Sequence, residues 1–220
     1  MSLLTRTVRC AGPQMTRYAR LRLRAFSTLP GNPHIYVFPN PNSLQDSHIL
    51  SLLPSDPPTP ELSLGTTPEV PPRPSSLKEN HRFLNILHSV LAQFAHQDPD
   101  VISQASAMAS TGGHHLGAIQ AGNAAGGASD QGGMGGAGRG GWIHLSDRRN
   151  PPDYGRIAWP EDIFGSVEVD ERGKFVDGHG RYQPSGTYRI VTREGIFGLS
   201  PFLREKLVER LRSEEAAMKN

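Results

Sequence analysis

The sequence predicts an α+β fold in which a small C-terminal β-meander is closed by one helix and preceded by an amphipathic helical pair. Both tryptophans, three of the five tyrosines and four of the eight phenylalanines lie within 142–220, and large aromatic side chains bury the most apolar area per residue. The same region combines strand-like alternation with a terminal helical pattern. A large fraction of the remaining chain has the composition of disordered segments.

Three strands are predicted in the C-terminal region. Valines alternate with acidic residues over 166–170, as expected for a strand with one buried face. A turn at 170–173 ends in glycine, and 174–176 would return as the partner strand. Alternation over 187–192 predicts the third strand.

One helix completes this predicted domain, which covers 142–213. Ser200 can accept hydrogen bonds from first-turn amides, and Pro201 has no amide hydrogen to leave unpaired, so both favour a helix start. Leucines at four-residue spacing then form an apolar stripe that can pack on the sheet. Residues 214–220 are predicted to be a tail.

The first 26 residues have the composition of a mitochondrial transit peptide. They contain six arginines, and no acidic residue occurs before Asp46. The stretch from Arg24 to Ser27 resembles a matrix processing site. Without these six arginines the formal net charge changes from +2 to −4, so the basic balance belongs to the N-terminus. We therefore expect a protein of the mitochondrial matrix; a basic arm that binds anionic surfaces is the alternative.

The next segment, 27–74, is rich in proline and is predicted to be disordered. It holds 12 of the 19 prolines, few aromatic residues and no sustained periodicity. The short apolar run at 34–38 is β-prone. It could add as an edge strand to the C-terminal sheet or to a partner, or be an incidental patch.

Two amphipathic helices are predicted within 75–111. Ser76 and Glu79 have the spacing of a capping box, and apolar residues follow at helical spacing up to about His96. Asp98 and the proline after it predict the start of the second helix. The pair could dock on the C-terminal domain or form a separate partner-binding element.

The segment 112–141 is predicted to be a flexible linker, because it contains 13 glycines. Glycine spacings at 133–138 and 136–141 match a dinucleotide fingerprint. That fingerprint needs a preceding strand and a following helix, so neither match predicts a nucleotide site.

Composition also excludes several chemistries. Cys10 is the only cysteine and lies in the predicted transit peptide, so the mature chain would have no disulfide, thiolate metal site or cysteine nucleophile. No apolar run is long enough for a transmembrane helix, and no cofactor is predicted. Residues 142–220 carry 13 basic and 13 acidic side chains, which argues against a nucleic-acid footprint. A local patch of arginines is still possible: Arg148, Arg149, Arg156, Arg181 and Arg189.

The candidates for catalysis are histidines and carboxylates of the C-terminal region: His144, Asp153, Glu161, Asp162, Asp177 and His179. His144 and His179 each have a carboxylate within three residues, as a base with its orienting partner would. His144 also fits a half-exposed strand residue, and His179 fits the tip of a glycine turn. No nucleophile elbow, phosphate-binding loop or metal motif occurs, so we predict that the protein is not an enzyme.

Gly140, Gly141 and Trp142, with the runs RIAWPEDIFG at 156–165 and GLSPFLR at 198–204, resemble a group of fungal proteins. Those proteins also carry a mitochondrial-type N-terminus and a glycine-rich middle. The resemblance implies the localisation and the boundaries given above. It implies no activity and no catalytic residue.

The sequence therefore predicts a non-catalytic accessory or assembly protein of the matrix that binds a larger protein complex. A folded core of about 80 residues is marginal alone, which favours a stabilising partner. The residues expected to bind that partner are large and apolar: Phe83, Leu87, Leu91, Phe94, Trp159 and Phe164. The alternatives are a matrix RNA- or mitoribosome-associated protein and a small hydrolase that uses His144 or His179.

Overall fold

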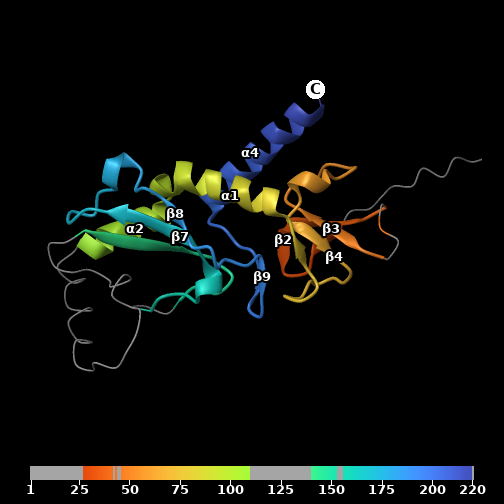
Figure 1. Cartoon of the computed structure of the whole chain (residues 1–220), viewed down its shortest axis with the longest axis horizontal. Helices are drawn as coiled ribbons and strands as arrows, with labels where there is room; N and C mark the ends of the chain where they lie inside the picture. The colour runs from red at the N-terminus through yellow and green to blue at the C-terminus, as the bar shows by residue number, and fades with distance from the viewer. Residues whose placement is uncertain (1–26, 42, 44–45, 110–139, 153–155, 220) are drawn as a thin grey trace, which may run out of the picture.

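The computed structural model describes residues 27–41, 43, 46–109, 140–152 and 156–219. Two antiparallel sheets lie on either side of helix α1 (His81–Phe94), as Figure 1 shows. The fold is therefore α+β, as the sequence predicts. The predicted transit peptide and most of the predicted glycine-rich linker lie outside the described residues.

The N-terminal half contains a five-stranded antiparallel sheet whose strands follow one another in sequence order. These strands are β1 (Ser27–Leu29), β2 (Asn32–Pro39), β3 (His48–Ser51), β4 (Gly65–Thr67) and β5 (Lys78–Glu79). The short 3-10 helix η1 (Pro60–Leu62) precedes β4. Because Tyr36 pairs with Thr28 on one side and Ser51 on the other, β2 is an interior strand.

The prediction that 27–74 is disordered is wrong. Proline interrupts a sheet only where a ladder amide is needed. Most prolines here lie at strand ends or between strands, and Pro33 lies in the part of β2 where the pairing with β1 is irregular. Pro30 precedes the turn at Gly31, Pro39 ends β2 and Pro68 follows β4. The apolar run at 34–38 belongs to β2 and is not an edge strand of the C-terminal sheet. Apolar residues between the prolines are buried: Leu29, Ile35, Val37, Phe38, Ile49, Leu50, Leu52, Leu53, Leu62 and Leu64.

The first helix of the predicted pair begins later than expected, because its cap is Asn80 and not Ser76. The Asn80 side chain accepts a hydrogen bond from the Arg82 amide at 3.0 Å. The Ser76 hydroxyl instead accepts from the backbone amide of Arg73, and Glu79 lies in β5. The capping-box prediction is therefore wrong.

The second helix, α2 (Pro99–Ala109), follows the 3-10 turn η2 (Ala95–Gln97) and has the predicted cap. Asp98 Oδ1 accepts from the Asp100 amide at 2.8 Å. The other carboxylate oxygen of Asp98 accepts a short hydrogen bond from the Ser200 hydroxyl. The cap of α2 is thus joined to the cap of the C-terminal helix.

The C-terminal half forms a three-stranded antiparallel sheet and a separate hairpin. The sheet has the order β6 (Gly141–Ser146), β7 (Ile163–Val169) and β8 (Gln183–Pro184), and the hairpin joins β9 (Val191–Thr192) to β10 (Gly195–Ile196). Two 3-10 turns, η3 (Pro160–Asp162) and η4 (Val176–Gly178), lie before and after β7.

The predicted meander is confirmed in its first part and is shorter than expected afterwards. The strand at 166–170 lies in β7, and Gly173 has the left-handed φ of +74° that the turn requires. The return strand at 174–176 consists of a single bridge between Phe175 and Val169. The chain then enters η4, so β8 becomes the neighbour of β7. Of the predicted strand at 187–192, the structure contains only β9.

Helix α4 (Pro201–Lys219) starts as predicted, since the Ser200 hydroxyl accepts from the Leu203 amide at 3.1 Å. It continues through most of the predicted tail, because Glu215 receives hydrogen bonds from Ser55 at 2.8 Å and Thr59 at 3.2 Å. The buried leucines of α4 pack beside α1 and not on the sheet alone.

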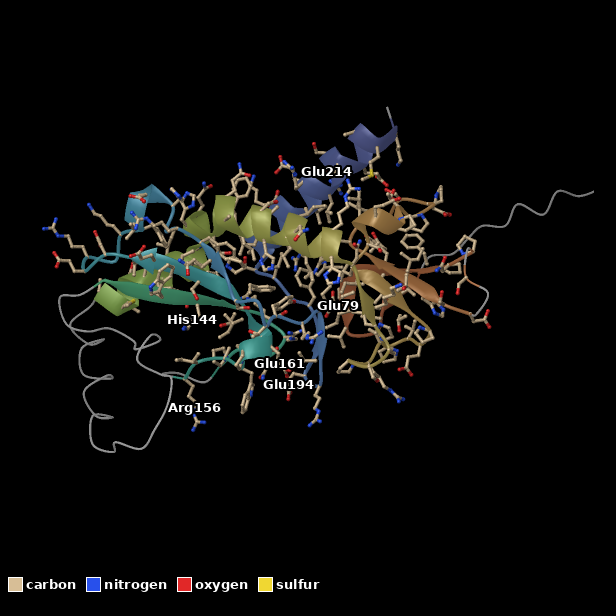
Figure 2. All side chains as sticks on the ribbon, viewed as in Figure 1. Glu79, His144, Arg156, Glu161, Glu194 and Glu214 are labelled. Carbon is tan, nitrogen blue, oxygen red and sulfur yellow. The ribbon has the colours of Figure 1, made fainter. Side chains whose placement is uncertain are left out.

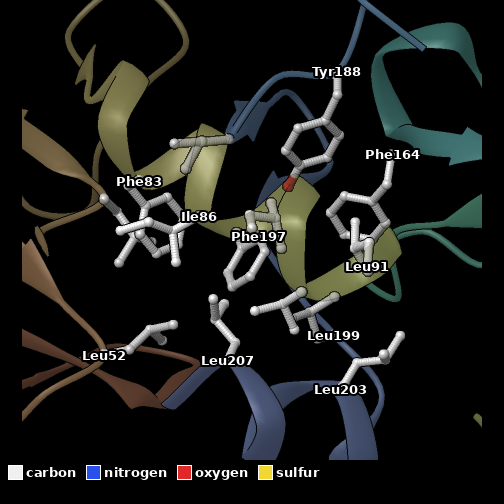
Figure 3. Packing of buried hydrophobic residues seen from close by; sticks show 14 of the residues in the cluster. Leu52, Phe83, Ile86, Leu91, Phe164, Tyr188, Phe197, Leu199, Leu203 and Leu207 are labelled. Atoms are coloured by element: carbon white, nitrogen blue, oxygen red, sulfur yellow. The ribbon is translucent and has the colours of Figure 1, made fainter. Parts of the chain in front are cut away.

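One hydrophobic core joins both sheets and the helices (Figure 3). Phe83 of α1 packs edge-on against Phe197, with ring centres 5.8 Å apart. Phe197 packs in the same way against Phe164 of β7, with ring centres 6.1 Å apart. The ring centres of Phe164 and Tyr188 are 4.5 Å apart. The helical pair is therefore docked, and the N-terminal sheet belongs to the same core.

Candidate functional site

Of the six residues predicted to bind a partner, Trp159 is the most exposed, at 69% of its accessible surface. Phe94 is half-buried, with the Lys206 ammonium 5.3 Å from the centre of its ring. The other four are buried in the core, so the prediction that they bind a partner is wrong: Phe83, Leu87, Leu91 and Phe164.

The backbone around Trp159 is fixed from below. The carbonyl of Pro160 accepts a hydrogen bond from the Thr187 hydroxyl at 2.7 Å. The carbonyl of Glu161 accepts from the Arg189 amide at 3.1 Å. These bonds tie η3 to the chain between β8 and β9. Trp159 is therefore an exposed aromatic side chain on an ordered backbone.

Arg149 holds η3, the turn that follows Trp159, from inside the protein. Its side chain is only 3% exposed. Its Nε donates to Asp162 Oδ1 at 2.7 Å. Its terminal nitrogens donate to three backbone carbonyls, those of Ile190 at 2.8 Å, Glu161 at 3.0 Å and Arg189 at 2.7 Å. One buried guanidinium thus joins η3 to the segment before β9. A planar fork of donors suits this role, whereas a lysine could not reach all these acceptors.

A second buried carboxylate completes the network. Asp147 Oδ2 accepts from the Tyr188 hydroxyl at 2.8 Å, while Oδ1 accepts from the amides of Arg149 and Gly198, each at 2.9 Å. The Arg149 guanidinium lies 5.3 Å from the centre of the Tyr188 ring. Burial raises the pKa of Asp147 to about 6, although Arg149 and the hydrogen-bond donors oppose this shift.

This raised pKa predicts how stability depends on pH. The folded protein holds the Asp147 proton more tightly than the unfolded chain, so this residue lowers stability as pH rises from about 4 to about 6, by up to about 3 kcal/mol. Urea unfolding of the wild type and of Asp147→Asn across this range measures the effect. We expect the wild type to lose stability relative to the variant as pH rises. If the difference in free energy of unfolding between the wild type and Asp147→Asn did not change with pH in this range, the raised pKa of Asp147 would be contradicted.

An apolar surface surrounds Trp159. Ile157, two residues away, is 50% exposed, and these two side chains are the most exposed large apolar residues in the described part of the chain. They border a shallow hollow of about 340 Å³ with Pro151 and Pro152, and Arg156 is the one charged side chain on its described lining. Figure 2 shows the Arg156 side chain pointing away from the ribbon.

The histidine candidates for catalysis lie on different elements. His144 lies on β6, where its Nδ1 is 2.7 Å from the Ser166 hydroxyl of β7, and burial lowers its pKa. These two residues face each other across the strands. They do not line the hollow beside Trp159, nor the pocket between α2, β6 and the start of α4. His179 follows η4, where its Nδ1 contacts the Asp177 carbonyl. The structure therefore does not bring His144 and His179 together.

The acidic candidates have structural partners or face solvent. Asp162 is buried against Arg149, and its Oδ2 has no hydrogen-bond partner. Asp177 pairs with Arg181 at 2.6 Å, and Glu161 is exposed. Asp153 lies outside the described residues.

The patch of five arginines suggested by the sequence does not form. Arg149 is buried, Arg148 lies 3.5 Å from Asp100, and Arg181 binds Asp177 on a different turn. Arg156 and Arg189 are exposed. Arg148 and Arg181 are exposed as well but are already paired with carboxylates, and the other two guanidinium groups give little of the phosphate contact that nucleic-acid binding requires.

A larger pocket of about 360 Å³ lies between α2, β6 and the start of α4. Its buried polar groups are Asp98, Asp147 and Ser200, and each is already used within the fold. Asp98 and Ser200 cap helices and bind one another, while Asp147 accepts three hydrogen bonds. The pocket therefore offers few unused polar groups to a ligand.

Comparisons with protein-family models, curated proteins and solved structures found no match to this chain. Among the described residues, no group of three or more histidine, cysteine or acidic side chains is arranged to hold a metal ion. The helices in this part of the chain include none that is long and apolar enough to cross a membrane.

Proposed function

We propose that this protein is a non-catalytic accessory protein of the mitochondrial matrix, and that it binds a larger protein complex through the surface around Trp159. The single observation that carries the proposal is a highly exposed tryptophan on a backbone held by a buried arginine. Tryptophan is among the residues most enriched at the energetic centres of protein interfaces. Its exposure is unfavourable in water unless a partner covers it.

The fixed backbone is the second support for this proposal. Binding normally costs free energy because mobile side chains and loops must become ordered. Here the hydrogen bonds of Thr187, Arg189 and Arg149 already hold the residues on the C-terminal side of Trp159. A partner would meet an aromatic anchor whose position is largely set before binding.

The composition of residues 1–26 supports the matrix location, and Ser27 is the first residue of β1. The RNA-binding alternative has less support, because the five candidate arginines are dispersed or paired. The hydrolase alternative, which uses His144 or His179, also has less support, because neither histidine lines either pocket.

Replacing Trp159 with alanine tests the proposal. We expect the variant to fold with a free energy of unfolding within about 0.5 kcal/mol of the wild type, because the side chain is exposed. The tagged full-length variant should nevertheless lose the large complex in a gentle mitochondrial extract run on a native gel. The co-migrating proteins of the wild type would then identify the partner.

Ile102→Ala is the matched control, since Ile102 is 43% exposed on α2, in another part of the chain. It should retain the complex. Loss of the complex in both variants would point to a general effect of truncating exposed apolar residues. A wild-type protein that migrates as a free monomer, or a complex that Trp159→Ala leaves intact, would contradict the proposal.

A further inference from the structure

The residues that line the hollow beside Trp159 indicate which kind of partner it would bind. This inference rests on the proposed function and concerns the same surface. Five of its lining residues are apolar, namely Pro151, Pro152, Ile157, Ala158 and Trp159, and its one charged described lining residue is Arg156. We infer that the surface binds a protein segment that carries a large apolar side chain next to a carboxylate.

The size of the hollow favours a side chain over a cofactor. Its volume of about 340 Å³ is near the lower end of the range of about 300–1,000 Å³ that is typical of small-molecule sites. The proline rings, Ile157 and the indole of Trp159 provide apolar contacts on its walls. One aliphatic or aromatic side chain of a partner would remove this surface from water.

The charge of the lining favours an acidic neighbour. Arg156 is exposed beside the apolar residues, and its guanidinium can bind a carboxylate with two parallel hydrogen bonds. Figure 2 shows Glu161 and Glu194 on the same side of the molecule as Arg156, but neither glutamate lines the hollow. A segment with lysines in place of acids would meet Arg156 with like charge and lose this contact.

A nucleic acid fits this surface less well. Trp159 could stack on a base, but a single guanidinium provides little of the phosphate neutralisation on which such complexes depend. Prolines provide no amide donor for phosphate oxygens. We therefore commit to a protein partner and include an RNA probe in the test.

The test uses the full chain and a labelled synthetic peptide that contains leucine and phenylalanine. The positions flanking these residues are all glutamate, all glutamine or all lysine in three versions of the peptide. Fluorescence anisotropy of the label measures binding at low salt. We expect the glutamate peptide to bind about two- to fivefold more tightly than the glutamine peptide, as for an exposed ion pair. The lysine peptide should bind most weakly.

Two variants separate the contributions. Arg156→Gln should bind the glutamate and glutamine peptides equally, while Trp159→Ala should bind none of the three. Arg172→Gln, at the exposed turn after β7, is the matched control and should retain the preference. Higher salt should reduce the glutamate preference, because an exposed ion pair is screened.

The outcomes distinguish this inference from the proposed function. Equal binding of the three peptides, a preference for lysine, or no binding at all would overturn the acidic partner. Loss of the native complex in Trp159→Ala would still support the accessory function. Tighter binding of a single-stranded RNA oligonucleotide than of the glutamate peptide would assign the surface to nucleic acid and overturn both.

Discussion

Replacing Arg149 with alanine should lower the free energy of unfolding by about 3–5 kcal/mol, because it removes one partner of a buried ion pair. Asp162 would remain buried without its cation, and the carbonyls of Glu161, Arg189 and Ile190 would each lose the hydrogen bond from the guanidinium. Small domains are stable by only about 5–15 kcal/mol, so the loss would be a large fraction of the total. Urea unfolding followed by tryptophan fluorescence measures it.

Two further variants show whether the geometry of the guanidinium matters. Arg149→Lys keeps the positive charge but cannot bind four acceptors at once, so it should fall between the wild type and Arg149→Ala. Arg172→Ala, at an exposed position, should change stability by less than about 0.5 kcal/mol. If Arg149→Ala lowered the free energy of unfolding by less than about 1 kcal/mol, the hydrogen bonds of Arg149 would not be what holds η3 in place.

Truncation of Phe83 should have the second large effect. Phe83 is 0% exposed and contacts the Phe197 ring, which in turn contacts Phe164. Removing a buried phenylalanine ring leaves a cavity and costs about 3–5 kcal/mol. Because the two sheets share this core, tryptophan fluorescence and circular dichroism should report one coincident unfolding transition at a lower urea concentration.

Phe83→Leu serves as the control, since it keeps most of the apolar volume and should cost less than Phe83→Ala. The same experiment separates a core residue from a binding residue. If Phe83→Ala unfolded like the wild type and yet lost the native complex, Phe83 would bind the partner as the sequence pattern suggests. Two separate transitions would show that the sheets do not form one cooperative core.

The predicted partner-binding residues show why a helical stripe is ambiguous. Phe83, Leu87 and Leu91 recur at the spacing of an apolar helix face, and that face is buried equally well by a partner or by the rest of the chain. The chain itself buries it here, because the segment before the helix forms a sheet. The number of prolines in 27–74 led to the wrong prediction of disorder, because a count does not show where each proline lies relative to a strand.

Almost nothing in the local sequence predicts the buried hydrogen-bond network around Arg149. Asp147 and Arg149 are neighbours in a charged loop, and adjacent acidic and basic residues are most often solvated. Their partners Asp162 and Tyr188 are distant in the sequence. Trp159 was predicted for its size and aromatic character, although aromatic residues of that kind are usually buried.

By itself, the sequence determined the α+β class, the two amphipathic helices, the strand around Val167 and the helix that Ser200 caps. These features depend on periodicity and on capping chemistry within a few residues, so local sequence contains them. Only the tertiary structure decided that the proline-rich segment is a sheet, that Arg149 is buried and that Trp159 is exposed. Burial depends on which surfaces meet across long sequence separations, and no window of neighbouring residues contains that information.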